Sequence, residues 1–348
     1  MNVALDLGSH WFRSLRVDGT RLVSRRSRAV FATLPDSAAR RGLLERAGVS
    51  YAIGDDYLAL IGQAADEFSS VFQIECRDLM PFGDLPVDDP VARQVIAILM
   101  EALLPEASST GELCCLIRCG GGESDPGRLS RRTEFFSRLI RLRGYRPVEL
   151  SAGMSVVYAG LVDQGFTGIG LDLGASGCDM AVAHCGVPVA SCWVPRGGRW
   201  IDEQLARRQQ WTASESHGRS KPDVSRAATT KLACHGTLLN PVGDDEKILA
   251  KLYRELLTPA IQQLARTLNS RGESSIRHPH PLLIVCTGGA TRVPGFADFL
   301  HQLLREMPLP VPVGSVRLAE DAEYALLRGG LIHTEVECLA RQKSRQAA

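Results

Sequence analysis

The chain has 348 residues, of which 45% are hydrophobic and 23% charged, and its formal net charge is +1. This composition is typical of a globular protein with one large or two smaller domains, and the balanced charge argues against nucleic-acid or membrane-surface partners. Ten cysteines without zinc-type spacing or a leader segment lead us to expect a cytoplasmic protein. Because no apolar run reaches the roughly 18 residues that a membrane span needs, we expect no direct membrane anchor.

In chain order, the first half is predicted to alternate strands and helices. A glycine-rich stretch, 120–127, lacks the Gly-Lys-Ser/Thr ending of a P-loop, so we interpret it as a turn. The helix after it carries six arginines within 128–143, which we interpret as a solvated face. The predicted strands are 3–7, 15–17, 21–24 and 113–117, and the predicted helices are 91–104 and 129–142.

The second half repeats this alternation. Residues 212–226 are polar and are predicted to form a mobile loop or a shortened subdomain, and 336–348 a flexible tail. We therefore divide the chain into a first lobe, 1–160, and a second lobe, 161–335. The predicted strands of the second half are 168–173, 180–183, 186–194 and 282–286, and its predicted helices are 200–210, 246–269, 295–306 and 320–331.

Two segments share one design, and each opens one half of the chain. Asp6 is followed by Leu-Gly-Ser and Asp172 by Leu-Gly-Ala-Ser-Gly, each at the end of an apolar strand. A glycine after the aspartate lets the backbone turn so that successive N–H groups face a phosphate, and a carboxylate there can hold Mg²⁺. We predict paired phosphate-binding turns, formed by Gly8 and Ser9 in the first segment and by Gly174, Ala175, Ser176 and Gly177 in the second.

A third glycine motif follows the strand predicted at 282–286. Gly288 and Gly289 end this strand, and a helix follows Pro294-Gly295. Bare glycine backbone lets a flat ring or a ribose lie close to the chain, and the turn before the helix supplies N–H donors. We therefore predict that this motif binds a nucleoside.

These three motifs, in this order, resemble the two phosphate motifs and the adenosine motif of the actin-like ATPase superfamily, which includes actin, heat-shock chaperones and sugar kinases. The resemblance covers nearly the whole chain and is greatest to the bacterial rod-shape actin homologue MreB. It implies an α/β fold of two lobes, each a mixed β-sheet flanked by helices, with ATP and Mg²⁺ in the cleft between them.

The resemblance also implies roles for single residues. Asp6 and Asp172 would serve the metal and the catalytic step. Gly197, Gly198, Lys231 and Arg292 would join the glycine turns in holding the nucleotide. For Lys231, an exposed lysine without such a role is an equal alternative.

Several residues depart from the family pattern. Ala152 stands where relatives carry a Glu or Gln that orients the attacking water, and alanine cannot do so. Arg199 replaces an aspartate of the Gly-Gly turn, Ala175-Ser176 replaces a Gly-Gly pair, and His10-Trp11-Phe12 is bulkier than usual. No lysine precedes Lys221, so the phosphate-end lysine of the chaperones is missing. We expect a weak ATPase at most.

Three functions remain open at this point. The first is an MreB-type cytoskeletal protein, acting in cell shape, whose self-association into filaments or binding of protein partners follows its nucleotide state. The second is a scaffold that binds ATP and hydrolyses nothing. The third is a kinase of the same fold for a small metabolite, although nothing marks Asp179 or Asp202 as the base that it needs.

Overall fold

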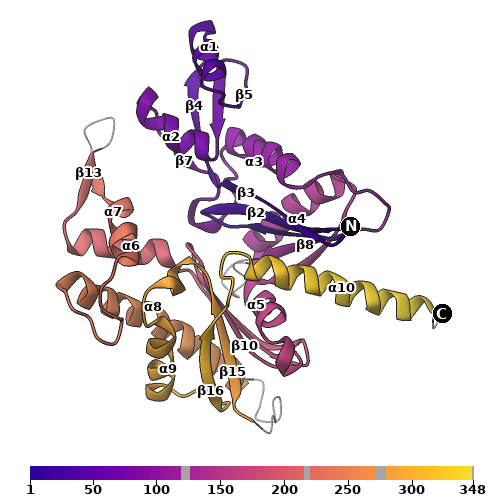
Figure 1. Cartoon of the computed structure of the whole chain (residues 1–348), viewed down its shortest axis with the longest axis vertical. Coiled ribbons are helices and arrows are strands. Elements are labelled where there is room, and N and C mark those ends of the chain that lie inside the picture. The colour runs from indigo at the N-terminus through magenta and orange to yellow at the C-terminus, as the bar shows by residue number, and fades with distance from the viewer. Residues whose placement is uncertain (119–125, 215–219, 271–279, 347–348) are drawn as a thin grey trace.

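The computed structural model describes residues 1–118, 126–214, 220–270 and 280–346. The chain forms two lobes of the same design, arranged along the long axis of the molecule (Figure 1). Each lobe is built on a five-stranded sheet, with strand order β3-β2-β1-β8-β9 in the first lobe and β12-β11-β10-β15-β16 in the second. Both sheets combine antiparallel and parallel pairs, so the predicted α/β fold with a mixed sheet in each lobe is confirmed.

In the first lobe, side chains alternate between the two faces of the central strand β1. Val3, Leu5 and Leu7 belong to the core beneath α3 and α4, whereas Ala4 faces α5 and α10. By the same alternation Asp6 lies on the face that is turned toward the second lobe. The elements are β1 (Val3–Leu7), β2 (Trp11–Asp18), β3 (Arg21–Arg28), α3 (Pro90–Leu103), β8 (Leu113–Arg118), α4 (Pro126–Leu142), β9 (Arg146–Ser151) and α5 (Ala152–Gly160).

The second lobe repeats this alternation on its central strand, β10. Ile169, Leu171 and Leu173 pack into the core formed with α8 and α9, which leaves Gly170 and Asp172 on the inner face. The elements are β10 (Gly168–Leu173), β11 (Cys178–His184), β12 (Val187–Val194), α6 (Gly198–Arg208), α8 (Asp244–Ser270), β15 (Leu282–Thr287), α9 (Phe296–Glu306), β16 (Val313–Leu318) and α10 (Ala325–Gln346), with short helices η2 (Val162–Gln164) and η4 (Gly289–Arg292).

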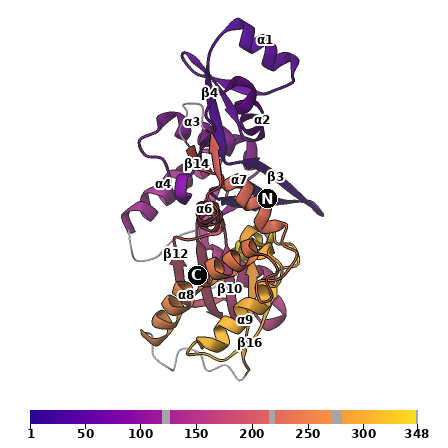
Figure 2. The ribbon, with the colours of Figure 1, turned by 90° about the vertical axis from the view of Figure 1, so that its left-hand side faces the viewer.

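Each lobe carries an insertion. The first has its own sheet, of order β5-β6-β4-β7, and its own small core, and Figure 2 shows it at the top of the molecule. It comprises β4 (Val30–Pro35), α1 (Ala38–Arg46), β5 (Tyr51–Ile53), β6 (Tyr57–Ile61), α2 (Gln63–Phe72), β7 (Arg77–Asp78) and η1 (Pro81–Gly83). The second is the smaller one and comprises β13 (Thr212–Ser214), β14 (Ser220–Pro222) and α7 (Val224–Leu232).

The helices α5 and α10 fill the space between the two sheets. Residues of both helices form one apolar cluster with Ala4 of the first sheet and with Ala181 and Val285 of the second. Their crossing depends on glycine, since a Cβ built on Gly329 of α10 would lie 1.9 Å from the carbonyl oxygen of Ser155 in α5. The two lobes are therefore joined by a closely packed helix pair.

Three elements differ from the sequence prediction. β2 begins at Trp11, four residues before the expected strand, because it pairs with the whole of β1. Part of the expected loop at 212–226 is regular, in β13, β14 and the start of α7. α10 begins later and ends later than the helix expected at 320–331, and its helical conformation continues to Gln346, through most of the expected tail. Of the glycine-rich stretch 120–127, expected as a turn, residues 120–125 lie outside the described residues, and Pro126 and Gly127 already belong to α4.

Among the described residues, no helix combines the length and the apolar character that crossing a bilayer would need.

Replacing Gly329 by alanine tests the helix crossing. Alanine favours a helix by about 1 kcal/mol, but overpacking a tight contact typically costs about 1–3 kcal/mol. We therefore expect Gly329→Ala to lower the free energy of unfolding in urea. The matched control is Gly42→Ala within α1, where the added Cβ meets only the end of the Arg46 side chain, at 3.5 Å, and stability should hold or rise. Equal effects at the two sites would contradict this account of the crossing.

Candidate functional site

Asp6 and Asp172 end the two central strands on their inner faces. Their exposed fractions are 2% and 4%, so both carboxyl groups are buried. Burial, followed by the neighbouring carboxylates of Asp6 and Asp179, raises the pKa of Asp172 well above its ordinary value. The fold thus brings the two predicted aspartates together at the junction of the lobes, where like charges destabilise each other.

Arg13 supplies a positive charge beside Asp6. The two residues are direct partners in the β1–β2 hairpin, and Nε and Nη2 of Arg13 lie 3.1 and 2.5 Å from Oδ2 of Asp6. Nη1 of Arg13 also donates to the carbonyl oxygen of Glu323, in the segment that leads into α10. Sequence reasoning missed Arg13 because it placed the strand at 15–17; a hairpin register that starts at Gly8 would have identified it.

Asp179 occupies the corresponding place in the second lobe. It is the direct partner of Asp172 in the β10–β11 hairpin, and its Oδ1 accepts a hydrogen bond from the N–H of Gly153, 3.0 Å away. A carboxylate at this position caps the first turn of α5. Ala152 begins that turn, and its methyl group is fully buried. Glu149, three residues before Ala152, lies in β9, where its Oε2 is 3.1 Å from Nε of Arg118.

The two predicted phosphate turns follow directly on these strands. In the first, Gly8 N–H donates to the Trp11 carbonyl at 3.0 Å. Ser9 Oγ is buried and has no hydrogen-bond partner within the described ranges, which is unusual for a buried hydroxyl and fits a group that awaits a ligand. In the second turn, Gly174 N–H donates to the Gly177 carbonyl at 3.0 Å.

The Gly197-Gly198 turn and the residue after it hold the second phosphate turn through backbone hydrogen bonds. Gly198 N–H donates to the Gly174 carbonyl at 2.8 Å, and Arg199 N–H donates to the Ala175 carbonyl at 3.0 Å. A Cβ on Gly197 would lie 2.4 Å from the Gly174 carbonyl oxygen, so only glycine permits this approach. Ser176, the remaining residue of the turn, is partly exposed.

The predicted nucleoside turn lies beside the second phosphate turn. Gly288 has a φ of +105°, and a Cβ there would lie 2.2 Å from the Leu173 carbonyl oxygen. A Cβ on Gly289 would have no atom within 4 Å, so open space adjoins its backbone. Arg292, at the end of η4, is exposed.

Lys231 is buried, so the interpretation of this residue as an exposed lysine is wrong. Its exposed fraction is 5%, and its Nζ lies 2.6 Å from Oδ1 of Asp202 and 3.2 Å from the Gly198 carbonyl oxygen. A Cβ on Gly198 would lie 3.4 Å from Nζ and 3.2 Å from Cβ of Ala290. Lys231 therefore joins α7 to the Gly197-Gly198 turn and to Asp202, while Gly198 itself adjoins Ala290 of the nucleoside motif.

The site offers the chemistry that Mg²⁺ with a nucleotide requires. Its donors are oxygen atoms of two carboxylates and a hydroxyl, which suit a hard cation. Within 1–118, 126–214, 220–270 and 280–346, no three His, Cys, Asp or Glu side chains gather into a metal site of their own. Mg²⁺ usually binds through one or two carboxylates together with substrate phosphates, and Asp6 and Asp172 are the carboxylates that would hold it here.

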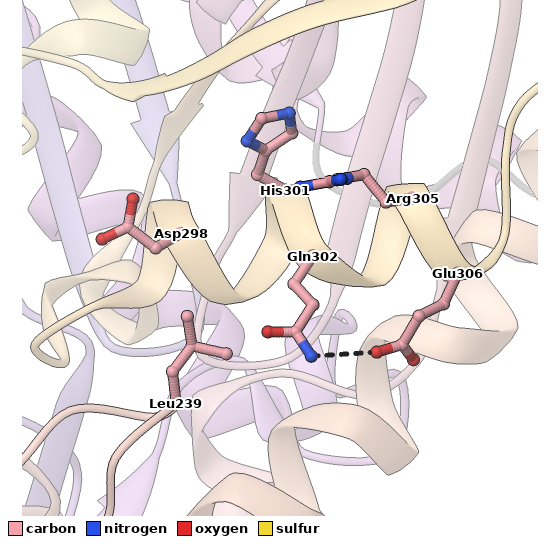
Figure 3. A pocket seen from close by; sticks show the side chains of 6 residues that line it. All are labelled: Leu239, Asp298, His301, Gln302, Arg305 and Glu306. Atoms are coloured by element: carbon pink, nitrogen blue, oxygen red, sulfur yellow. Dashed lines mark hydrogen bonds between the residues drawn. The ribbon is translucent and has the colours of Figure 1, made fainter.

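A separate hollow lies on the second lobe, along α9 (Figure 3). Its volume is about 520 Å³, and it contains none of the predicted site residues. Figure 3 shows that most of its lining comes from one side of α9. The lining residues are Leu239, Asp298, His301, Gln302, Arg305 and Glu306.

Known proteins were compared with the chain by sequence and by structure. The family model described as Volactin matches residues 1–334, and no curated protein matches the sequence. A structure described as "MamK double helical filament" has a TM-score of 0.65 and 16% identity, covering 96% of this chain and 99% of the other. MreB 5 of Spiroplasma citri bound to AMPPNP has a TM-score of 0.66 and 12% identity, covering 98% of both chains. MreB5 of Spiroplasma citri bound to ADP has a TM-score of 0.63 and 14% identity, covering 96% of both chains.

At these identities the likeness concerns the fold. It confirms the actin-like architecture that the three sequence motifs predicted.

The buried carboxylates predict an unusual stability change. Asp172→Asn keeps the shape of the side chain and replaces a carboxyl group, whose charged form the fold destabilises at neutral pH, with a neutral amide, so it should raise the melting temperature of the ligand-free protein at that pH. Differential scanning calorimetry measures the change. A lower melting temperature would show that Asp172 is already compensated in the folded chain.

For the buried Lys231–Asp202 ion pair we expect a loss of stability when one partner is replaced. Lys231→Met leaves a buried carboxylate unpaired, and breaking such a pair typically costs about 3–5 kcal/mol. Replacing both residues, in Lys231→Met with Asp202→Leu, should recover much of this loss in urea unfolding. Arg208→Met breaks an exposed pair with Glu255 and should cost less than about 1 kcal/mol. A similarly small loss for Lys231→Met would contradict the buried ion pair.

Proposed function

This chain belongs to the Volactin family, and from that premise and the geometry of the residues where its lobes meet we propose that it is an actin-like protein that binds ATP with Mg²⁺ between its lobes. One observation carries the proposal. Two glycine turns meet at a pair of buried carboxylates, and the hydroxyl of Ser9 beside them lacks a partner among the described residues. A set of buried oxygen atoms with excess negative charge favours a cation that arrives with phosphates.

Different residues would bind the metal, the phosphates and the nucleoside. Bound Mg²⁺, held by Asp6 and Asp172, supplies positive charge that neutralises phosphate oxygens. Ser9 Oγ and the backbone N–H groups of the turns other than those of Gly8 and Gly174 would donate to those oxygens, and Arg13 would add a guanidinium at the same end. The nucleoside end is formed by Gly288, Gly289 and Arg292 with the Lys231–Asp202 pair beneath the Gly197-Gly198 turn.

The structures of MreB 5 with AMPPNP and with ADP support this assignment, because they hold nucleotides in the fold that this chain shares.

Removing one metal ligand tests ATP binding. Asp172→Ala should weaken the binding of ATP with Mg²⁺ by about 1–3 kcal/mol, the typical cost of a lost charge-assisted contact, as measured by calorimetry. Asp298→Ala, in the separate hollow on α9, should leave the affinity unchanged. If the wild-type protein is folded and binds no ATP, the proposal is wrong.

We further propose that hydrolysis is slow. The side chain that begins α5 is the methyl group of Ala152, and the carboxylate of Asp179 accepts a hydrogen bond from the N–H of the next residue, Gly153. Neither arrangement supplies a free base for a water molecule, and general-base assistance is typically worth about 10²–10⁴-fold.

A neutral polar side chain at residue 152 should speed the reaction. We expect Ala152→Gln to raise ATP turnover by about tenfold or more, because an amide can orient water without adding a fourth carboxylate to the cluster. Ala152→Leu has similar bulk and no polar atoms, so it controls for repacking and should not raise turnover. Wild-type turnover of about 1–100 s⁻¹, as in many phosphoryl-transfer enzymes, would contradict the assignment.

Nucleotide-dependent assembly is the second part of the function. A ligand that binds between two lobes changes their relative angle, and a repeating contact that spans both lobes would sense that change. The MamK structure with this fold is a double helical filament, which supports self-association of this chain.

Light scattering at rising protein concentration tests assembly. The signal should rise with ATP above that with ADP or without nucleotide, and it should persist because slow hydrolysis delays the product state. A monomer under all three conditions would favour the alternative, an ATP-binding scaffold, which the buried methyl group of Ala152 also fits.

A further inference from the structure

Arg199 departs from the family pattern, and its side chain reaches from the second lobe to the first. Its Nη1 lies 2.5 Å from Oδ2 of Asp78, in β7 of the first lobe. The proposed nucleotide site does not use this ion pair, which spans the two lobes at the phosphate end.

The first-lobe side of the contact is firmly anchored. Leu79 and Met80, which follow Asp78, are fully buried in the first core, and Leu79 N–H donates to the Ala29 carbonyl at 2.8 Å. Arg77, which precedes Asp78, lies 4.4 Å above the Phe31 ring. Asp78 therefore cannot move toward Arg199 or away from it without moving the first lobe.

The second-lobe side is anchored on the second phosphate turn. Arg199 N–H donates to the Ala175 carbonyl at 3.0 Å, and Ile201, one turn into α6, is fully buried in the second core. Glu203 lies 3.7 Å from Arg199 Nε on the same helix face and helps to hold the guanidinium in place.

A second contact accompanies the ion pair. A Cβ on Gly83 would lie 2.6 Å from Oγ of Ser176, so the loop after Asp78 rests on the second phosphate turn. Arg132 holds this loop from the first lobe, donating to the carbonyl oxygens of Gly83 at 2.8 Å and of Leu7 at 3.2 Å. The loop is therefore tied to the end of β1, next to the first phosphate turn, and touches the second.

We infer that Asp78 and Arg199 form a latch that holds the two lobes together at the phosphate end and slows both entry and exit of the nucleotide. They are positioning residues and do not bind the ligand. This inference rests on the proposed nucleotide site. A latch that closes equally before and after binding slows both steps, so breaking it should speed association and dissociation together and leave their ratio, the affinity, almost unchanged.

The test is stopped-flow binding of a fluorescent ATP analogue with Mg²⁺. The pair is partly exposed, at 39% and 27% of its side-chain surfaces, so each of Arg199→Gln and Asp78→Asn should raise both rates by about two- to fivefold, the range of a partly solvated ion pair. The exchanged pair, Arg199→Asp with Asp78→Arg, should return toward wild-type rates. Arg208→Gln, which breaks an ion pair within one lobe, should change neither rate.

Two results would overturn the inference. Unchanged rates in both single variants would mean that the ion pair does not hold the cleft closed. Faster dissociation alone, with no recovery in the exchanged pair, would mean that Arg199 binds the phosphates directly.

A second measurement separates this inference from the nucleotide proposal. Small-angle X-ray scattering of the ligand-free proteins should give a larger radius of gyration for each single variant than for wild type, and the exchanged pair should reverse the increase. Opening of the lobes in a protein that binds no ATP would support the latch and reject the nucleotide site. An unchanged radius together with normal ATP binding would reject the latch alone.

Discussion

The crossing of α5 and α10 is the contact on which the rest of the structure depends. Each sheet turns its inner face toward this helix pair, and the helices approach closely because glycines line the contacts. A Cβ on Gly329 would lie 1.9 Å from the Ser155 carbonyl oxygen, and one on Gly170 would lie 2.1 Å from the Gly153 carbonyl oxygen. This spacing brings the ends of β1 and β10 together and so determines where Asp6 and Asp172 meet.

The same closeness has an electrostatic cost. Asp172 is buried beside two other carboxylates, which raises its pKa and destabilises its charged form. A cation with phosphates would relieve that cost, so in our proposal the unfavourable burial of these carboxyl groups is also the source of the affinity for the ligand. Residues that are held in a locally unfavourable arrangement by the surrounding fold are common at functional sites.

The two lobes repeat one hairpin with different chemistry. In each, the residue seven positions after the aspartate is its direct strand partner, and this partner is Arg13 in the first lobe and Asp179 in the second. The first hairpin therefore pairs its carboxylate with a cation that also contacts the segment leading into α10, while the second directs its extra carboxylate at α5. The two hairpins thus have the same backbone register but different roles: the residue paired with the aspartate compensates its charge in the first lobe and caps a helix in the second.

Local patterns in the sequence determined the central strands, the principal helices and the three glycine motifs. Alternating burial and glycine-dependent turns are properties of a few consecutive residues, so Val3–Leu7, Gly168–Leu173 and Gly288-Gly289 could be recognised one by one. The order of the motifs then predicted the actin-like fold, which the structural likeness confirms.

Only the tertiary structure decided which side chains meet. Arg13 was missed because its place beside Asp6 depends on a hairpin register, and Lys231 could not be assigned because its partner, Asp202, lies on another helix. The Arg199–Asp78 contact joins residues that are far apart in the chain and in different lobes. Pairings of this kind depend on the angle at which the lobes pack, and no short stretch of sequence encodes that angle.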